Sequence, residues 1–435
     1  MSTIQSLPAV LRRPRSSGMI ARLARALVHQ RLAGIRDGQL AVEDSGGVRR
    51  FGEASDLPCA SLRVLDPGFY ARVALSGSLG FAESFLRGEW TTDDLTNLLS
   101  VFARNLSRHG GGRWASAAFA RPLARLGHAL SANSRRGSRK NIHAHYDLGN
   151  AFYALFLDDT MTYSCAVFPE RASSLREASV RKLDLVCRKL GLAPGQRVLE
   201  IGTGWGSFAI HAAKHYGCHV TTTTISDAQH QLALERIRAE GLTDRIEVLT
   251  TDYRDLEGSF DRLVSIEMIE AVGHENLPAY FRACADRLRS DGAMLLQAIT
   301  MPDRDYDDYL TSADYIQCYV FPGSSLPSLG AITSAVARTD LRIDHLESIG
   351  RHYGETLRRW RASFTARLPE IKALGFDDRF VRLWTYYLCY CEAGFEEGYV
   401  DDLQLVLAKP AWRGAPIASE SANRDLASAL SGARA

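Results

Sequence analysis

The stretch VLEIGTGWGSFAI at residues 198–210 constrains the fold more than any other part of the chain. An apolar run ends in an acid, three alternating glycines follow, and an apolar helical pattern then resumes. A strand, a glycine-rich turn and a helix in this order are typical of the start of a nucleotide-binding fold. A phosphate-binding loop would end in Gly-Lys-Ser or Gly-Lys-Thr, and a dinucleotide-binding turn would carry glycine where this chain has Ser207. Neither pattern fits.

The pattern that remains is the E-x-G-x-G-x-G turn of S-adenosylmethionine (SAM) methyltransferases. We expect Glu200 to end the first strand of the fold. We expect the glycines to let the backbone close over the amino acid part of the cofactor, because glycine tolerates conformations that other residues avoid. These glycines are Gly202, Gly204 and Gly206.

The second strand of such a fold usually ends in an acid that binds the ribose hydroxyls. In this chain the strand ends in TTTTISDAQ, residues 221–229, with no acid at that position. We therefore expect Thr224 and Gln229 to bind the cofactor through neutral hydrogen bonds.

Strand-like and helix-like segments alternate from residue 197 to residue 300. This alternation predicts a doubly wound, Rossmann-like α/β sheet with crossover helices. An aromatic-rich insertion at residues 303–360 interrupts the pattern.

The chain ahead of this sheet has a different pattern. Short alternating strands are predicted over residues 39–75, and helices over 18–33, 82–86 and 95–106, which indicates a smaller α+β domain. A polar linker at 131–140 follows. The predicted organisation is an N-terminal lipid- or membrane-associating domain at 1–130, a catalytic methyltransferase domain at 131–410 and a disordered tail at 411–435.

The composition excludes several classes of protein. The chain has 435 residues, of which 46% are hydrophobic, and its net charge is +2. No apolar run approaches the roughly 20 residues that a membrane-spanning helix needs. The eight cysteines show no C-x-x-C spacing and the histidines no metal-ligand spacing, so we expect free thiols, a cytoplasmic location and no metal.

Positive charge is concentrated in two stretches without acids, residues 1–36 and 95–146. Such stretches attract anionic surfaces. Residues 18–33 also form an amphipathic helical pattern with arginines between the apolar positions. We expect the protein to bind the anionic inner face of a phospholipid bilayer peripherally; an ordinary solvated arginine-rich face is the alternative. Nucleic acid is not an expected partner, because the chain lacks the Asn-Pro-Pro-Tyr type of tetrapeptide.

Eight further motifs accompany the glycine turn in a fixed order. Those before the turn are GSLGFAESFLRGEW (77–90), HYDLGN (145–150) and MTYSCAVF (161–168). Those after it are TDYRD (251–255), EMIEAVG (267–273), YIQCYVFPGSSLPS (315–328), HYGETLRRW (352–360) and TYYLCYCEAGF (385–395). With these motifs the chain resembles cyclopropane-fatty-acyl-phospholipid synthases from about residue 61 to residue 409.

The resemblance implies a SAM-dependent enzyme that acts on the cis double bond of unsaturated acyl chains in membrane phospholipids. Transfer of a methylene group through a carbocation would form a cyclopropane ring. The cofactor contacts that it implies, together with the acid of the glycine turn, are Tyr163, Ser164, Glu200, Gly202, Gly204, Thr224, Gln229, Tyr253 and Arg254.

The resemblance also implies a bicarbonate ion beside the reacting carbon, acting as the base. Its implied ligands are the backbones of Cys165 and Ile299 and the side chains of Glu270 and Tyr353. Many members of the family have a histidine where this chain has Gln297, which can donate a hydrogen bond to an anion but cannot carry a charge. Cys391 matches a cysteine that is regarded as catalytic in the family, although the expected mechanism does not use it.

Three alternatives remain open. A methyl- or methylene-branched fatty acyl synthase would share the methyl transfer but lose a different proton, and Gln297 keeps this possibility in play. A lipid-binding protein with a relic methyltransferase domain would not bind SAM. A nucleic-acid methyltransferase would use the basic stretches. The sequence also leaves open whether the protein is a monomer or a homodimer.

Overall fold

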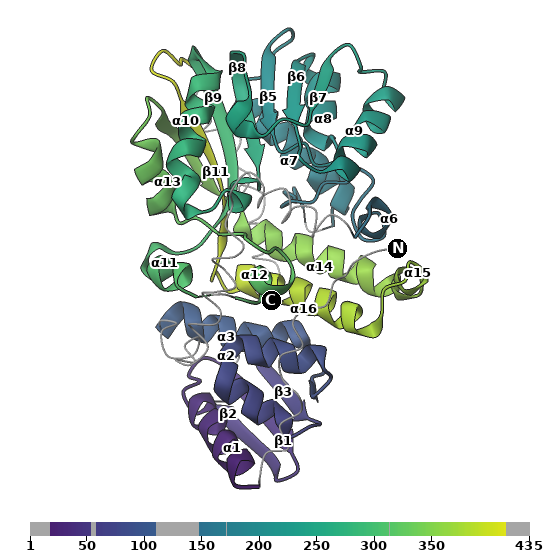
Figure 1. Ribbon diagram of the computed structural model, residues 1–435, viewed down its shortest axis with the longest axis vertical. Coiled ribbons are helices and arrows are strands. Elements are labelled where there is room, and N and C mark those ends of the chain that lie inside the picture. Colours follow the sequence, from purple (N-terminus) through teal and green to yellow (C-terminus); the bar gives the residue numbers. More distant parts are fainter. Residues whose placement is uncertain (1–17, 54–57, 110–147, 171, 313, 415–435) are drawn as a thin grey trace. The chain divides into compact units, whose positions relative to one another are not determined.

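The computed structural model describes residues 18–53, 58–109, 148–170, 172–312 and 314–414 (Figure 1). The chain divides into two compact units, residues 1–123 and 124–435. The predicted domain boundary at residue 130 and most of the second basic stretch lie outside the described residues, as does the predicted tail from residue 415 onward.

The N-terminal unit is built on a four-stranded sheet in the order β2-β1-β3-β4. β1 and β2 form an antiparallel hairpin, β3 runs parallel to β1, and β4 pairs antiparallel with β3. The predicted smaller α+β region is confirmed. Its elements are α1 (Gly18–Leu32), β1 (Gln39–Asp44), β2 (Gly47–Gly52), β3 (Cys59–Val64), α2 (Gly68–Leu86), β4 (Trp90–Thr91) and α3 (Leu95–His109).

The strands predicted to continue to residue 75 are wrong beyond Val64. Residues Gly68–Leu86 form one helix, α2, which is kinked at Gly77, where φ is +57°. Phe69, Tyr70 and Phe81 are buried along this helix, so a helical apolar face overrides the short alternation in the sequence.

The C-terminal unit is built on a seven-stranded sheet in the order β10-β11-β9-β8-β5-β6-β7. β5 to β9 are parallel, whereas β11 is antiparallel to both of its neighbours, β9 and β10. The predicted doubly wound sheet is confirmed. Its strands are β5 (Arg197–Ile201), β6 (His219–Thr223), β7 (Ile246–Leu249), β8 (Phe260–Ile266), β9 (Leu288–Thr300), β10 (Arg342–Ser348) and β11 (Asp401–Ala408).

Helices cover both faces of this sheet, as Figure 1 shows. Side chains alternate across a strand, so Val198 and Leu199 on β5 belong to two different apolar cores. Leu199 packs in the core with α10 (Leu277–Arg287) and α13 (Leu329–Val336). Val198 packs in the core with α7 (Leu175–Lys189) and α8 (Ser207–Tyr216).

The remaining helices include two long ones, α14 and α16, which lie side by side (Figure 1). The Arg361 guanidinium on α14 donates two hydrogen bonds, of 2.7 and 2.9 Å, to the buried Glu392 carboxylate on α16. The other elements are α6 (Asn150–Tyr153), α9 (Asp227–Ala239), η2 (Tyr253–Asp255), η3 (Ile269–Ala271), η4 (His274–Asn276), α11 (Asp303–Leu310), α12 (Tyr315–Tyr319), α14 (Gly350–Ala366), α15 (Leu368–Ala373) and α16 (Asp378–Glu396).

Packing continues past residue 411, where the tail was predicted to begin. Trp412 is buried in the core, and the Arg262 guanidinium lies 4.4 Å from the centre of its ring. Among the residues that the structure describes, no helix is both long enough and apolar enough to cross a membrane.

Candidate active site

The glycine turn connects β5 to α8 in a left-handed backbone. Gly202, Gly204 and Gly206 have φ values of +104°, +52° and +86°. The value at Gly202 lies outside the range that other residues adopt, and a Cβ there would lie 3.2 Å from the Met268 side chain. A Cβ at Gly204 would meet no atom of the described residues within 4 Å beyond its two chain neighbours. The open side of the turn therefore lies at Gly204, where an extended ligand can approach the backbone.

Glu200, predicted to end the strand, is the second-last residue of β5, one position before the strand ends at Ile201, and is buried beside the turn. Its Oε2 accepts a 2.6 Å hydrogen bond from the Thr222 hydroxyl on β6. Burial raises the pKa of this carboxyl to about 8, against the lowering effects of Thr222 and of the Lys182 charge. A cationic ligand in the turn would favour its ionised form.

Thr224 and Gln229, predicted to replace the missing acid, lie next to each other. The Thr224 hydroxyl donates to the Gln229 Oε1 at 2.9 Å, and both residues are buried. Ser226 caps α9 by accepting from the Gln229 backbone N–H, which holds Gln229 at the start of that helix. The structure brings this pair together but gives it no charge.

Tyr163 and Ser164 come from the segment before α7. The Tyr163 hydroxyl is hydrogen-bonded to that of Tyr387 at 2.9 Å, and its ring lies 5.2 Å from that of Trp360. The Ser164 hydroxyl accepts a 2.7 Å hydrogen bond from Nζ of Lys182, a fully buried lysine on α7. Burial lowers the pKa of Lys182, and the charges of Glu267 and Glu200 oppose that shift. Lys182 is therefore coupled both to Glu200 and to the acids described below.

Tyr253 and Arg254 lie on η2, after β7. The Tyr253 hydroxyl is buried and has no hydrogen-bond partner among the described residues. Burial raises the pKa of this hydroxyl to about 12, so it stays protonated and can donate to a ligand. Arg254 pairs with Asp252 at 3.0 Å and covers the Tyr253 ring, with its guanidinium 5.0 Å from the ring centre.

A second centre forms around Glu267, which follows β8. Glu267 Oε1 accepts hydrogen bonds from the Cys165 backbone N–H and from Gln297 Nε2, both at 2.8 Å. Its Oε2 accepts a 2.6 Å hydrogen bond from the Tyr353 hydroxyl. Three predicted residues from distant segments therefore converge on one carboxylate that was not predicted.

The position of this carboxylate depends on an uncommon backbone conformation. Glu267 has φ +49°, one of two left-handed residues other than glycine in the described chain. The residue as a whole is half-buried, but its carboxylate is enclosed by the buried Cys165, Gln297 and Tyr353. Burial raises the pKa of Glu267, and the hydrogen bonds from Tyr353, Cys165 and Gln297 and the Lys182 charge oppose that rise.

Glu270 lies one turn further, on η3. Its Oε1 accepts a 2.6 Å hydrogen bond from the Ile299 backbone N–H. These two residues were predicted to lie at the same site. Its Oε2 is buried and has no partner among the described residues. Burial first, and then the Glu267 charge, raises the pKa of Glu270 to about 8. An unpaired buried carboxylate oxygen is costly unless a ligand or a positive charge faces it.

Asp402 on β11 completes the cluster and was also missed from the sequence. Gln297 Nε2 donates to Asp402 Oδ2 at 2.9 Å while it also donates to Glu267. Burial and the charges of Glu267 and Glu270 raise the pKa of Asp402 well above its ordinary value. Asp402 therefore carries a proton when Glu267 is ionised, because the amide of Gln297 bridges two acids that share one enclosed volume.

Bicarbonate does not fit the donors that the resemblance implied for it. The Cys165 N–H, the Tyr353 hydroxyl and the Gln297 amide all donate to Glu267, and the Ile299 N–H donates to Glu270. A carboxylate carries the same charge and similar oxygens as bicarbonate, so Glu267 already supplies the anion that these donors select. No step below uses bicarbonate.

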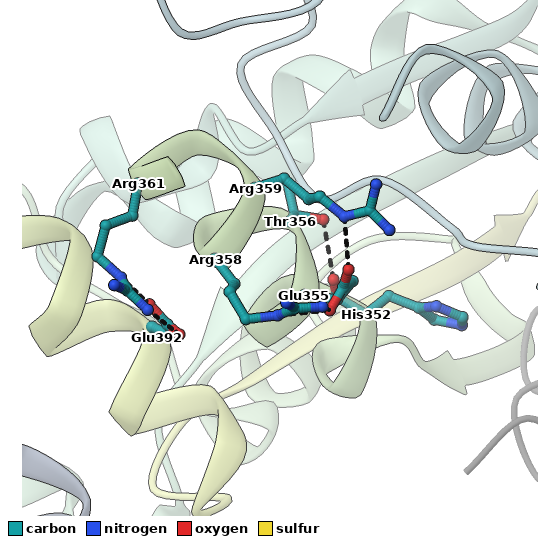
Figure 2. A network of polar contacts seen from close by, with 7 residues as sticks. All are labelled: His352, Glu355, Thr356, Arg358, Arg359, Arg361 and Glu392. Carbon is teal, nitrogen blue, oxygen red and sulfur yellow. Dashed lines mark hydrogen bonds and ion pairs between the residues drawn. The ribbon is translucent and has the colours of Figure 1, made fainter. Parts of the chain in front are cut away.

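Helix α14 holds the segment that carries Cys165. The Thr356 hydroxyl accepts from the Ala166 N–H at 3.2 Å and donates to the His352 carbonyl oxygen at 2.8 Å. His352 Nδ1 accepts from the Phe168 N–H at 3.2 Å. Figure 2 shows His352 and Thr356 on α14 close to Glu355, which accepts from Arg358 and Arg359. The backbone N–H of Cys165 is thus positioned by residues nearly 190 positions further along the chain.

Cys391 lies on α16. Burial, followed by the charges of Asp314 and Cys389, raises the pKa of its thiol far above the ordinary value. A thiol in such surroundings stays protonated and is a poor nucleophile. Lys182 and Asp402, which were not predicted, contact the predicted residues directly. The first acid of the EMIEAVG motif, at the end of a strand, was the signal for Glu267.

Comparisons with known proteins agree with this geometry. A family model described as mycolic acid cyclopropane synthetase matches residues 133–405. The tuberculostearic acid methyltransferase UfaA1 of Mycobacterium tuberculosis is 40% identical over 366 residues, which cover 82% of this chain and 85% of that protein. The cyclopropane-fatty-acyl-phospholipid synthase of Escherichia coli K12 is 36% identical over 361 residues, covering 82% of this chain and 90% of that protein.

A solved structure is similar to this chain and comes from the same family. The mycolic acid cyclopropane synthase CmaA1, crystallised in complex with SAH and CTAB, superposes with a TM-score of 0.59 and is 32% identical. The match covers 62% of this chain and 98% of that one. The residues matched by the family model, 133–405, lie within the C-terminal unit, which is called the catalytic unit from here on.

Proposed function

The chain belongs to the mycolic acid cyclopropane synthetase family of SAM-dependent enzymes that modify lipid acyl chains, and on this premise we propose its substrate, its base and its product. The substrate is the cis double bond of an unsaturated acyl chain in a membrane phospholipid. The observation that carries the proposal is the enclosed Glu267 carboxylate, held by Cys165, Gln297 and Tyr353 beside the glycine turn's end of the sheet.

An alkene is a poor nucleophile, so it needs a strong electrophile, and SAM supplies an activated methyl group when it is bound. The new carbon–carbon bond leaves a carbocation on the acyl chain. The chain's own residues must then stabilise this cation, exclude water and accept one proton.

Glu267 is the proposed proton acceptor. Its hydrogen bonds favour the ionised form against the burial that raises its pKa, and an enclosed carboxylate held in this way suits a base beside a carbocation. The Tyr353 hydroxyl holds Oε2 at 2.6 Å and so fixes the direction of the carboxylate. The neighbouring Asp402 accepts from the same amide nitrogen but already carries a proton, so the new proton goes to Glu267.

Glu270 is proposed to stabilise the cation electrostatically. Its Oε2 is buried without a partner, so a positive charge nearby would relieve the cost of burying it. Aromatic rings add to this effect: Tyr353 stacks on Phe395 at 4.4 Å, and Tyr163 packs against Trp360. These rings also keep water away from the cation.

The identity of the lost proton decides the product. Removal from the new methyl group closes a cyclopropane ring, the product named for the E. coli relative. Removal from a chain carbon beside the cation leaves a methyl branch next to a new carbon–carbon double bond, and the M. tuberculosis relative is named a methyltransferase. Glu267 and Gln297 both depart from the bicarbonate site expected of a ring-forming member, and this favours the branched product as the second candidate.

The membrane surface is the proposed location of the substrate. Helix α1 exposes an apolar stripe of Met19, Ile20, Leu23 and Leu27, while its opposite side packs in the N-terminal unit through Ala24 and Val28. Arg22 is exposed within the same stripe. Apolar residues with arginines beside them are typical of a helix that lies on an anionic bilayer.

Lipid analysis of an expressing host tests the proposal. The host must contain unsaturated phospholipids, and mass spectrometry with fragmentation of the released acyl chains separates a ring from a branch. We expect a one-carbon addition at the former double bond with the unmodified enzyme. Unchanged acyl chains from a folded protein that binds SAM would contradict the proposal, and a product found only in free fatty acids would contradict the phospholipid substrate.

A further inference from the structure

A row of buried polar side chains crosses the sheet toward Glu267. Glu347 on β10 pairs in register with Gln404 on β11, and Gln404 pairs in register with Gln297 on β9. Directly opposed residues place their side chains on the same face, here the face that α7 covers. Lys189, in the last turn of α7, reaches the far end of this row.

Each hydrogen bond in the row has a defined direction. Lys189 Nζ donates to Glu347 Oε2 and to Gln404 Oε1, both at 2.6 Å. Gln404 Nε2 donates to Gln297 Oε1 at 3.0 Å. Gln297 Nε2 then donates to Glu267 Oε1 and to Asp402 Oδ2. Lys189, Gln404 and Gln297 are all buried, so water does not compete for these groups.

Both ends of this row have a fixed polarity, because an ammonium group only donates and an ionised carboxylate only accepts. A side-chain amide can turn its oxygen or its nitrogen to either side, whereas an ammonium group donates and never accepts. The Lys189 ammonium therefore requires the oxygen of Gln404 to face it. The nitrogen of Gln404 must then face Gln297, and the nitrogen of Gln297 must face the two acids.

We propose that Lys189 and Gln404 are positioning residues that orient the Gln297 amide so that its nitrogen, and not its oxygen, faces the Glu267 carboxylate. The inference rests on the proposed role of Glu267 as the base. With the amide reversed, three oxygens would face one another in an enclosed space, and Glu267 would lose a donor that favours its ionised form.

The other titratable and hydrogen-bonding groups around Glu267 would remain in place after such a reversal. They are Tyr353 on α14, Asp402 on β11, Glu270 on η3 and Lys182 on α7, and Cys165 contributes its backbone N–H. At the far end, His345 lies 4.0 Å from Glu347 and does not contact Gln297 in the described chain. A change at Gln404 therefore reaches Glu267 through Gln297.

The substitution Gln404→Glu tests this orientation with almost no change of shape. An ionised glutamate keeps the partner of Lys189 but can only accept, so Gln297 must donate to it and turn its oxygen toward Glu267. A hydrogen bond to a charged group is worth enough that its loss should lower kcat about 10- to 100-fold. The acid limb of the kcat/KM pH profile should move about one pH unit higher, because ionised Glu267 has lost a donor.

Two further variants separate orientation from general damage. Gln404→Met removes the constraint without reversing it, and we expect a smaller shift of the acid limb in the same direction. Gln317→Glu changes another buried glutamine, on α12, that donates to the Tyr309 hydroxyl at 3.1 Å. It should lower stability but leave the acid limb in place.

An unmoved acid limb in a folded and active Gln404→Glu protein would overturn the inference. If that variant does not fold, an unmoved limb in Gln404→Met has the same meaning. Absence of any lipid product from the unmodified enzyme would instead count against the proposed function. The row can still be tested in that case, because the side-chain amide protons of Gln297, observed by NMR, should shift as Glu267 titrates in the unmodified protein and not in Gln404→Glu.

Discussion

The cofactor side and the acid side of the catalytic unit are assembled in different ways. On the cofactor side, Glu200, the glycine turn, Thr224 and Gln229 come from one continuous stretch of about thirty residues that runs from β5 into α9. On the acid side, one carboxylate collects donors from Cys165, Gln297 and Tyr353. A local motif therefore defines the first side, whereas only the completed sheet defines the second.

The two sides also differ in charge. Glu200 is the buried acid of the cofactor side, while Glu267, Glu270 and Asp402 share the acid side. Lys182 lies between them and responds to acids of both sides. In the proposed mechanism, separate acids would therefore face the cationic cofactor and the cationic intermediate.

Replacing the acid Glu267 by its amide should have the largest effect, and it should affect the acid side without affecting the cofactor side. Glu267→Gln keeps the shape of the base and removes its charge, and loss of such a preorganised group costs about 10²–10³ in rate. We expect lipid methylation, measured with labelled SAM, to fall by that order, while SAM affinity by calorimetry stays close to that of the unmodified enzyme.

Two controls accompany this substitution. Glu257→Gln changes an exposed acid and should alter neither quantity. Glu267→Gly, at a residue whose φ of +49° suits glycine, opens the space of the carboxylate, so added bicarbonate should restore part of the activity. Full activity in Glu267→Gln, or a bicarbonate requirement in the unmodified enzyme, would remove Glu267 from the mechanism.

Two glycine substitutions sharpen the comparison within the cofactor side. Gly202→Ala forces a Cβ against Met268 at a φ of +104°, and such strain costs about 1–3 kcal/mol of the free energy of unfolding. Gly204→Ala meets no atom of the described residues beyond its two chain neighbours, so we expect a smaller loss of stability but weaker SAM binding. Chemical denaturation and calorimetry measure the two effects. Equal SAM affinity in Gly204→Ala and the unmodified protein would show that the cofactor does not approach that glycine.

A pH series tests the raised pKa values on both sides. Glu200 and Glu270 have folded-state pKa values of about 8, above the ordinary value of 4.5. Their contribution to stability is therefore full below about pH 4.5 and is lost as the pH rises through about 8. We expect the free energy of unfolding without ligand to fall by about 1–3 kcal/mol per group between pH 6 and 8.

The two acids should then separate when SAM is added. SAM binding should strengthen as the pH rises, because its positive charge favours ionised Glu200, and Glu200→Gln should flatten this dependence. Glu270→Gln should flatten the pH dependence of unfolding. A pH-independent free energy of unfolding in the unmodified protein would contradict the assignment of both buried acids.

The smallest expected effect lies in the N-terminal unit. Arg22→Gln on α1 removes one exposed charge beside the apolar stripe, and a basic residue near an anionic bilayer contributes about 1 kcal/mol. Binding to vesicles that contain anionic lipid should weaken about fivefold. Arg338→Gln, at an exposed arginine of the catalytic unit, should change it less. Equal binding to neutral and anionic vesicles at high and low salt would contradict a membrane role for this helix.

The sequence predicted the sheet and the place of the glycine turn between β5 and α8 well, because alternating periodicity and a contiguous glycine turn are local properties. It did not predict that residues 68–75 are helical, since a short alternating run there is part of the longer face that buries Phe69 and Phe81. It also did not predict β10 and β11 as strands of the sheet.

The acid side was predicted only in part, for a physical reason. Cys165, Glu270, Gln297, Ile299 and Tyr353 were named through the resemblance, but the carboxylate on which three of them converge was not. Whether Glu267 or a free anion accepts from these donors depends on a backbone φ at the end of β8. Asp402 and Gln404 depend in turn on the register of β11 against β9. Neither this backbone conformation nor the register between two strands is encoded in a local sequence pattern.

The position of β11 has a consequence for the order of folding. This is the last strand in the described chain, yet it lies inside the sheet, between β9 and β10. Until it is inserted, Gln297 lacks both Gln404 and Asp402, and the edges of β9 and β10 that pair with β11 have no partner strand. Contacts between segments so far apart in sequence form late, because closing a long loop costs entropy before any contact repays it. During synthesis the glycine turn can therefore be complete well before the acid cluster exists. A partly synthesised chain could then bind its cofactor before it has the acids that the reaction needs.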